Sequence, residues 1–292
     1  MSYFFSQLIN GLQSGSIYAL VALGYSMVYG IIKLLNFAHG DIIMVGAYVI
    51  WLAVATWNLP LWVSLPLAVL ACTVLGMLIE KVAYAPMRSA PRISILITAI
   101  GVSYLLENLA QLIFGAGAQT IPPLFSNDGF SVGDTYISYT AAITIVVAVI
   151  SMVILTFLVQ KTRLGKAMRA VSEDTGAAQL MGIPVNRTIS FTFAVGSALA
   201  GIGAILYATA YPQATPTMGS MLGLKAFVAA VLGGIGSIPG AMIGGFAIGF
   251  AEVLASAMRL SVWKDGIVFA ILIIVLLVKP SGIMGHEIQE KV

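Results

Sequence analysis

The chain has 292 residues, of which 60% are hydrophobic and only 9% are charged, with a formal net charge of +3. Soluble domains carry about 25% charged residues, so this composition excludes a water-soluble globular protein and indicates a chain surrounded by lipid. A single cysteine, Cys72, excludes an intrachain disulfide.

Apolar segments of membrane-spanning length follow one another along almost the whole chain. A helix needs roughly 20 apolar residues to cross about 30 Å of hydrocarbon. The seventh segment is too long for one simple span and is interrupted by glycines and a proline, which predicts a re-entrant half-helix. We therefore predict an all-α, polytopic membrane protein with a single transmembrane domain over residues 1–292. The segments cover residues 9–32, 36–57, 61–80, 93–114, 138–160, 188–211, 225–258 and 261–279.

The distribution of basic residues predicts the orientation in the membrane. Short loops rich in Lys and Arg stay on the cytoplasmic side. Residues 81–92 and 161–187 carry several of them, whereas 115–137 and 212–224 carry none. We therefore place the first two segments in the cytoplasm, and the other two outside together with the N-terminus. Counting on through a re-entrant segment places the C-terminus inside.

The second apolar segment begins with a break, residues 36–41, in an otherwise helical pattern. Unwound backbone at membrane depth is tolerated only where protein or a water-filled cavity satisfies it. Open helix ends also present N–H groups that suit a carboxylate. The break is thus a candidate part of a translocation path, and a short cytoplasmic turn with solvated side chains is the alternative. The candidate residues are Asn36, Phe37, His39, Gly40 and Asp41.

A second break, residues 233–240, divides the seventh segment. Pro239 suits the first turn of a new helix. The preceding residues 225–235 make only about 17 Å of helix at 1.5 Å per residue, which favours a half-helix dipping into the membrane. This break is the other candidate for the path, and a packing device without substrate contact is the alternative. The candidate residues are Gly234, Gly236, Ser237, Pro239 and Gly240.

Several charged residues fall within the predicted spans. Glu107 and Glu252 would be costly in lipid, so each is either functional or hydrogen-bonded to a neighbouring helix. Glu80 and Lys81 lie at the end of a span, where we expect both side chains to reach out to water.

The basic segment 161–187 contains a predicted short helix, residues 173–181. Ser172 is a good N-cap, and Gly182 is a natural residue to follow the last helical turn. A helix this short is not stable alone in water, so it must pack on a partner or on the membrane end of this chain. The helix carries acidic residues in its first turn and small or flexible apolar residues after it: Glu173, Asp174, Ala177, Ala178, Leu180 and Met181.

The sequence contains no motif for chemistry of its own. A phosphate-binding loop requires G-x-x-x-x-G-K-[ST], which the chain lacks, and its two histidines, His39 and His286, form no metal-ligand pattern. We therefore expect a chain that is not an enzyme and that binds neither a cofactor nor a metal.

Three stretches give the chain a family resemblance. They are Gly15 to Leu20 running on to Asn36–Gly40 and Gly46–Tyr48, then Gly165–Ala170 through Leu180–Ile183, and last Leu232–Ala241. In these stretches the chain resembles the LivH-type permease subunits of bacterial ABC importers for branched-chain amino acids.

The resemblance implies a place in the bacterial inner membrane and a set of partners. These are a second, homologous permease subunit, two cytoplasmic ATPase subunits that bind the ATP, and a periplasmic amino-acid-binding protein, with no nucleic acid. In such permeases a short helix followed by glycine docks on the ATPase, which implies that role for residues 173–182, Gly182 included. Permeases for urea and short amides look similar. An ion-coupled secondary transporter using Glu107 or Asp41, and a passive channel, are alternatives of another class.

Overall fold

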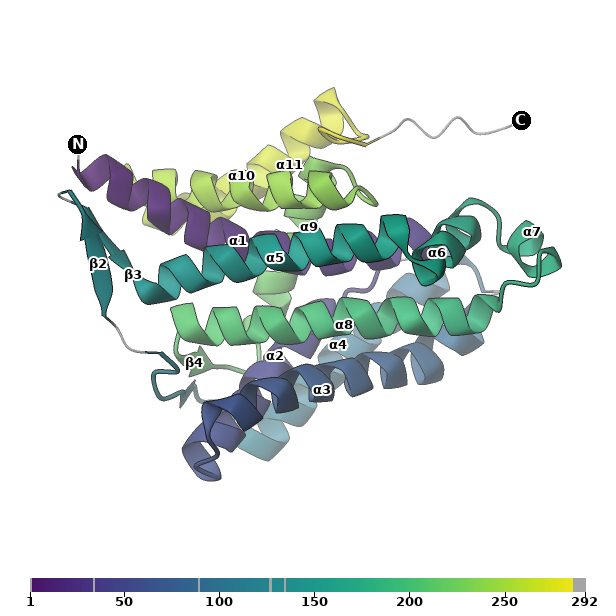
Figure 1. The fold of residues 1–292 in the computed structure, drawn as a ribbon, viewed down its shortest axis with the longest axis horizontal. Coiled ribbons are helices and arrows are strands. Elements are labelled where there is room, and N and C mark those ends of the chain that lie inside the picture. Colours follow the sequence, from purple (N-terminus) through teal and green to yellow (C-terminus); the bar gives the residue numbers. More distant parts are fainter. Residues whose placement is uncertain (1, 34, 89, 126–127, 134, 286–292) are drawn as a thin grey trace.

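A computed structural model describes residues 2–33, 35–88, 90–125, 128–133 and 135–285. In this part of the chain, eight helices are long and apolar enough to cross a membrane, which confirms the predicted all-α polytopic fold. They lie roughly side by side as a bundle; the connection over residues 115–138 carries a β-hairpin at one end, and that over residues 162–184 carries two small helices at the other (Figure 1).

The helix bounds agree with the predicted segments to within a few residues, except at the N-terminus and in the broken seventh segment. Proline helps to set them, because α3 follows Pro60 and α4 follows Pro91, and proline suits a helix start. The spanning helices are α1 (Ser2–Ile32), α2 (His39–Trp51), α3 (Leu61–Ile79), α4 (Arg92–Phe114), α5 (Tyr139–Lys161), α8 (Val185–Ala210), α10 (Ile238–Ala257) and α11 (Lys264–Val278).

Shorter elements extend or connect these helices. Wider helical turns prolong α2 and α3, and a tight turn leads into α11. Two small helices lie between α5 and α8, and a half-length helix precedes α10. These elements are η1 (Leu52–Thr56), η2 (Glu80–Tyr84), η3 (Ala85–Met87), η4 (Ser261–Trp263), α6 (Arg163–Glu173), α7 (Thr175–Leu180) and α9 (Met218–Gly233).

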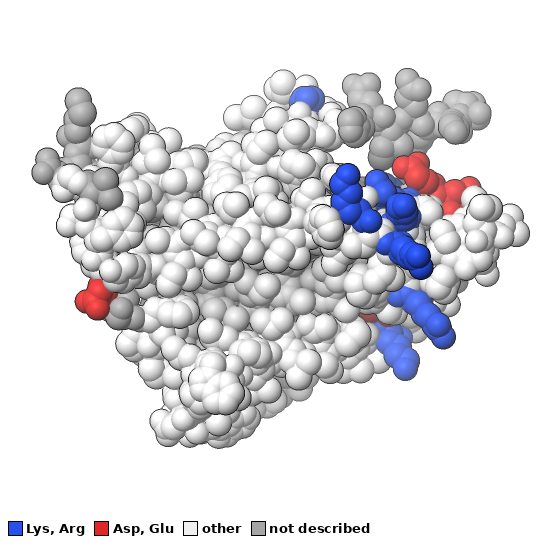
Figure 2. Space-filling view, in the orientation of Figure 1, with Lys and Arg blue, Asp and Glu red and all other residues white. Residues whose placement is uncertain are grey.

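The two ends of the bundle differ in charge and in structure. Most of the Lys and Arg visible in Figure 2 gather at the end that carries α6 and α7. The positive-inside rule predicts that this end faces the cytoplasm, and we call it the cytoplasmic end. At the other end, β2 (Gly129–Val132) forms a hairpin with β3 (Thr135–Ser138), and β1 (Gln119–Thr120) pairs with β4 (Gln213–Ala214). Because β1 and β4 pair, the two loops predicted to lie outside are on the same side.

The first helix forms the centre of the bundle, packed along α10 through small residues. A Cβ at Gly15 would collide with the backbone of Phe246, and one at Gly245 would collide with the backbone of Ala19. Such contacts let helix backbones approach closely where lipid offers no hydrophobic driving force. In contrast, α4, α5 and α11 carry many exposed apolar side chains, as expected of helices that face lipid.

The predicted half-length helix is present as α9, although it begins at Met218 rather than at residue 225. The prediction that this segment is re-entrant is wrong, because the chain runs from β4 at one end of the bundle to Gly233 at the other and does not return. Its first turn packs on Gly40 of α2, and its last residue lies beside the C-terminal part of the chain. There the N–H groups of Ile283 and Met284 donate to the carbonyls of Leu232 and Gly233, both at 2.9 Å. The described C-terminal part of the chain therefore lies at the cytoplasmic end, as predicted.

Candidate functional site

The first break turns the chain back into the membrane before α2 begins. α1 ends at Ile32 and α2 starts at His39, whose ring packs edge-on against Tyr25 at 4.9 Å. His39 also touches Gly24, which lies eight residues before the end of α1. At 1.5 Å per residue, α2 therefore begins about 12 Å inside the cytoplasmic end of α1.

The polar residues of this break are buried. Asn36 is 2% exposed, His39 1% and Asp41 0%, which excludes the alternative of a solvated cytoplasmic turn. The Tyr84 hydroxyl donates to Asn36 Oδ1 at 2.9 Å. Phe37 is half-buried and packs on Phe227 of α9.

The start of α2 does not present the open N–H groups that the sequence suggested. The N–H of His39 donates to the Asn36 carbonyl, and those of Asp41 and Ile42 donate to the Ala38 carbonyl. These donors are already used, so they are not free to hold a carboxylate. That the residues of this break line a path stays a prediction.

The second break is a glycine turn between α9 and α10, at the cytoplasmic end. Gly234 and Gly236 have φ of 104° and 93°, a conformation that favours glycine. Gly236 packs on Gly30, near the end of α1, and its N–H donates to Ser26 Oγ. Among the predicted path residues of this turn, Gly236 and Pro239 are exposed.

The same turn closes tightly onto the next helix. Ser237 caps α10, because its hydroxyl accepts from the N–H of Gly240 at 3.2 Å. Gly240 packs so closely on Gly233 that a Cβ on either residue would strike the backbone of the other. The packing role left open by the sequence is therefore real, and a role in the path stays a prediction.

The basic segment folds into two helices rather than one. Asp174 has an extended backbone and caps α7, accepting from the N–H groups of Gly176 and Ala177 at 2.8 and 2.9 Å. The prediction of a single helix over 173–181 capped by Ser172 is therefore wrong. Ser172 lies inside α6, where its hydroxyl donates to the Arg169 carbonyl, and Glu173 is the last residue of that helix.

The end of α7 agrees with the prediction. Gly182 has φ of 79°, and its N–H donates to the Gln179 carbonyl, while the Ile183 N–H donates to the Ala178 carbonyl. Ala178 is buried and anchors the helix, whereas Leu180 and Met181 are 91% and 82% exposed. The remaining predicted coupling residues, Glu173, Asp174, Ala177 and Gly182, are exposed as well.

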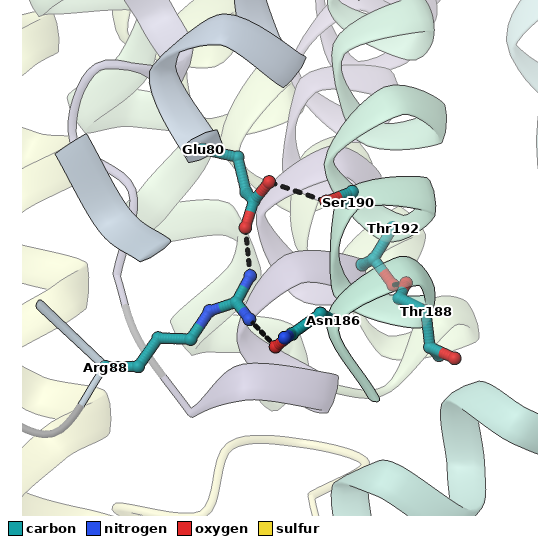
Figure 3. Close-up of polar contacts among 6 residues, drawn as sticks. All are labelled: Glu80, Arg88, Asn186, Thr188, Ser190 and Thr192. Carbon is teal, nitrogen blue, oxygen red and sulfur yellow. Dashed lines mark hydrogen bonds and ion pairs between the residues drawn. The ribbon is translucent and has the colours of Figure 1, made fainter. Parts of the chain in front are cut away.

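A polar cluster around the buried Glu80 ties the helix that follows this segment to the end of α3. Figure 3 shows Glu80 between Arg88 and Ser190: Arg88 forms an ion pair with Glu80, and the Ser190 hydroxyl donates to Glu80 Oε2 at 2.7 Å. Arg88 also donates to Asn186 Oδ1, near the start of α8. The expectation that Glu80 reaches out to water is wrong, because it is 2% exposed. We call Glu80, Arg88, Asn186 and Ser190 the polar clamp.

Two threonines of α8 in the same view are bonded within their own helix. The hydroxyl of Thr188 donates to the Pro184 carbonyl at 3.2 Å, and that of Thr192 donates to the Thr188 carbonyl at 2.8 Å. They therefore take no part in the polar clamp.

A cavity of about 760 Å³ opens beside the clamp at the cytoplasmic end. It lies between the end of α1, the segment that leads into α4, the α6–α7 connection and the start of α8. Its charged lining residues are Lys33, Arg88, Glu173 and Asp174. Both signs of charge are present, so the cavity does not select an anion or a cation.

A second ionic cluster, which the sequence did not suggest, lies within the bundle. Lys225 of α9 pairs with Glu252 of α10 and with Asp265 of α11, each at 2.6 Å. The Tyr18 hydroxyl of α1 donates to Glu252 at 2.6 Å. Glu252 is therefore paired inside the bundle, and the cluster holds α9 against three other helices.

The chain matches a known family over most of its length. Residues 7–276 match the family described as "Branched-chain amino acid transport system / permease component". The chain belongs to this family. It is 44% identical to the permease protein LivH of the high-affinity branched-chain amino acid transport system of Escherichia coli K12, over 99% of this chain and 98% of the relative.

Other family members are similar over the same span. The LivH permease protein of Salmonella typhimurium LT2 is 43% identical over 99% of this chain and 98% of its own length. The corresponding protein BraD of Pseudomonas aeruginosa is 41% identical over the same shares. Together with the eight spanning helices, family membership makes the chain a multi-pass membrane permease component. Among the described residues, no three His, Cys, Asp or Glu side chains lie close enough to hold a metal ion.

Proposed function

We propose that this chain is the permease subunit of an ATP-driven importer that carries branched-chain amino acids across the inner membrane. The relatives named above carry that substrate class in their names and align over nearly the whole chain. The sequence lacks a phosphate-binding loop, so in this proposal separate subunits bind and hydrolyse the ATP.

The observation that carries this proposal is the exposed tip of α7. Leu180 and Met181 are large apolar residues held out into water at the basic end of the molecule. The Asp174 cap, the buried Ala178 and the turn at Gly182 fix a helix that is too short to be stable alone. A fixed apolar tip in water is typical of a docking element, which fits a groove on an ATPase subunit.

The polar clamp offers a route from α7 into the membrane. The chain enters α8 only three residues after Gly182. Arg88 and Glu80 tie Asn186 and Ser190 of α8 to the end of α3. We propose that a displacement of α7 moves the start of α8 together with α3, because the buried Glu80 would lose both of its partners if the two helices separated.

We also assign the remaining partners by family membership. A second, homologous permease subunit would complete the path, and a periplasmic binding protein would deliver the amino acid to the end that carries the β2–β3 hairpin. In this arrangement the binding protein sets most of the selectivity.

Reconstituted vesicles test the proposal with two matched variants. We expect leucine uptake to require ATP and the partner subunits, and to survive collapse of the proton gradient. Leu180→Asp should lower leucine uptake at least tenfold, and the ATPase subunits should no longer co-purify with this chain. Val262→Asp is the control, because Val262 is equally exposed at the far end of the bundle, in η4; it should change neither. Leucine uptake by this chain alone, driven by a pH gradient, would favour a secondary transporter, and preferred uptake of urea or acetamide would overturn the substrate.

A further inference from the structure

Two broken helices, α2 and α9, begin against each other inside the bundle. A Cβ at Gly40, in the first turn of α2, would collide with the carbonyl of Gly219, in the first turn of α9. The carboxylate of Asp41 lies directly against Gly219. The absence of side chains at these two glycines therefore lets Asp41 reach the start of α9.

A second carboxylate reaches the same place from α4. The hydroxyl of Ser220, in the first turn of α9, donates to Glu107 Oε1. Glu107 and Ser103, one turn apart on α4, both lie close enough to Asp41 to interact with it. Three helices thus bring two carboxylates and two hydroxyls to one buried position.

This acidic pair lacks a partner of opposite charge. Asp41 is 0% exposed and Glu107 is 6% exposed. The Ser103 hydroxyl lies within reach of the Asp41 carboxylate, but among the described residues no Lys, Arg or His forms an ion pair with Asp41 or Glu107. The next basic residue along α9, Lys225, is bound by Glu252 and Asp265. Two neighbouring buried carboxylates without a counter-charge are costly, so the arrangement points to a cation from outside the chain.

The chemistry of the site fits an ammonium group. We propose that Asp41 and Glu107 bind the primary ammonium group of the transported amino acid, an inference that rests on the proposed function. An –NH₃⁺ group has three donors and no acceptor, and it forms strong charge-assisted bonds to carboxylates. Because the N–H groups of His39, Asp41 and Ile42 are already used, this end of α2 recognises the amine of the substrate rather than its carboxylate.

Ligand binding to the complete transporter in lipid discs, without the binding protein, tests the proposal by saturation-transfer NMR. The probes are leucine, isopentylamine, which lacks the carboxylate, and 4-methylpentanoate, which lacks the amine. Leucine and isopentylamine should bind the wild type, and Asp41→Asn should weaken both at least tenfold. Weak binding of 4-methylpentanoate, where detectable, should not change.

Two further variants separate binding from folding. Glu107→Gln keeps an acceptor for the Ser220 hydroxyl but removes the charge, so it should also weaken isopentylamine. Asp128→Asn makes the same change as Asp41→Asn at an exposed loop position and should have no effect.

The following results would overturn the ammonium site or the proposed function. The ammonium site would be overturned if Asp41→Asn weakened the binding of all three probes equally, or if it left isopentylamine binding unchanged. If millimolar Na⁺ displaced isopentylamine but leucine did not, the site would bind an inorganic cation, and the ammonium proposal would be overturned. The proposed function itself fails if the wild-type complex, with its binding protein and ATP, imports no amino acid. Only the ammonium site fails if the wild-type complex imports leucine and Asp41→Asn still binds isopentylamine.

Discussion

The two breaks in the helical pattern look alike in sequence but differ in the structure. Residues 36–41 are buried apart from the half-buried Phe37, and they bring α2 to a start inside the bundle. Residues 233–240 form a capped glycine turn with exposed positions at the cytoplasmic end. Glycines at a helix break therefore indicate close packing of the backbone in both places. Buried polar groups without a full set of partners distinguish the break that a ligand could use.

Hydrogen bonding separates the two breaks further. Around the second break, the Ser237 cap and the bonds from Ile283 and Met284 use the backbone groups of the turn. At the first break, Asn36 Nδ2 and His39 Nε2 lack hydrogen-bonding partners among the described residues, and the buried Asp41 carboxylate has no counter-charge there. Unpartnered buried groups are costly in a membrane and are typical of sites with a function.

The largest effect is expected where α9, the helix that meets the first break, is held in place. Lys225→Met leaves Glu252 and Asp265 without their cation inside the bundle. Removing one partner of a buried pair destabilises by about 3–5 kcal/mol, so thermal unfolding in detergent should occur at a clearly lower temperature. Unchanged unfolding would show that α9 does not depend on this cluster.

A smaller effect is expected at the contact between α2 and α9. Gly40→Ala places a methyl group against the Gly219 carbonyl, which is backbone and cannot rotate away. Overpacking of this kind costs about 1–3 kcal/mol and should lower both stability and uptake. The control is Gly203→Ala in α8, where the nearest atom would be a Val21 methyl at 3.4 Å. Equal behaviour of the two variants would contradict the close contact.

The smallest of these effects is expected at the second break. Gly236→Ala forces a residue with a side chain to φ of 93°, which costs about 1–2 kcal/mol. Gly117→Ala, in an outer loop with open space around it, should change the unfolding free energy by less than about 0.5 kcal/mol. If the turn is only a packing device, Gly236→Ala should lower stability while the transport rate per folded transporter stays normal. A transport defect larger than the stability loss would bring this turn into the path.

Features with a local physical cause could be predicted from the sequence. The spans follow from apolar length, the half-helix before Gly234 from its glycines, and the turn at Gly182 from the need for positive φ after a helix. The placement of the described C-terminal part of the chain at the cytoplasmic end follows from counting crossings, provided that the segment containing α9 is counted as a crossing of its own.

Features that depend on distant partners could not be predicted in this way. Glu80 resembles a residue at the end of a span, and only the fold brings Arg88 and Ser190 to it. Lys225 stands in an apolar segment with no sign of its partners on α10 and α11. The error at Ser172 is of another kind: Ser172 and Asp174 are both good helix caps, and Asp174 takes the role because the preceding helix extends to Glu173.

Thiol labelling tests most directly the central claim that the first break lines the translocation path. The experiment uses Ala38→Cys and Ser237→Cys, each with Cys72 replaced by serine, in vesicles that contain the complete transporter. Ser237 is half-buried in the cytoplasmic turn, so its cysteine should react with a water-soluble reagent in every state. Ala38 is 0% exposed, so its cysteine should be protected at rest and should react when ATP and the loaded binding protein are added. Protection of the cysteine at position 38 in every state would contradict the account and place the path elsewhere.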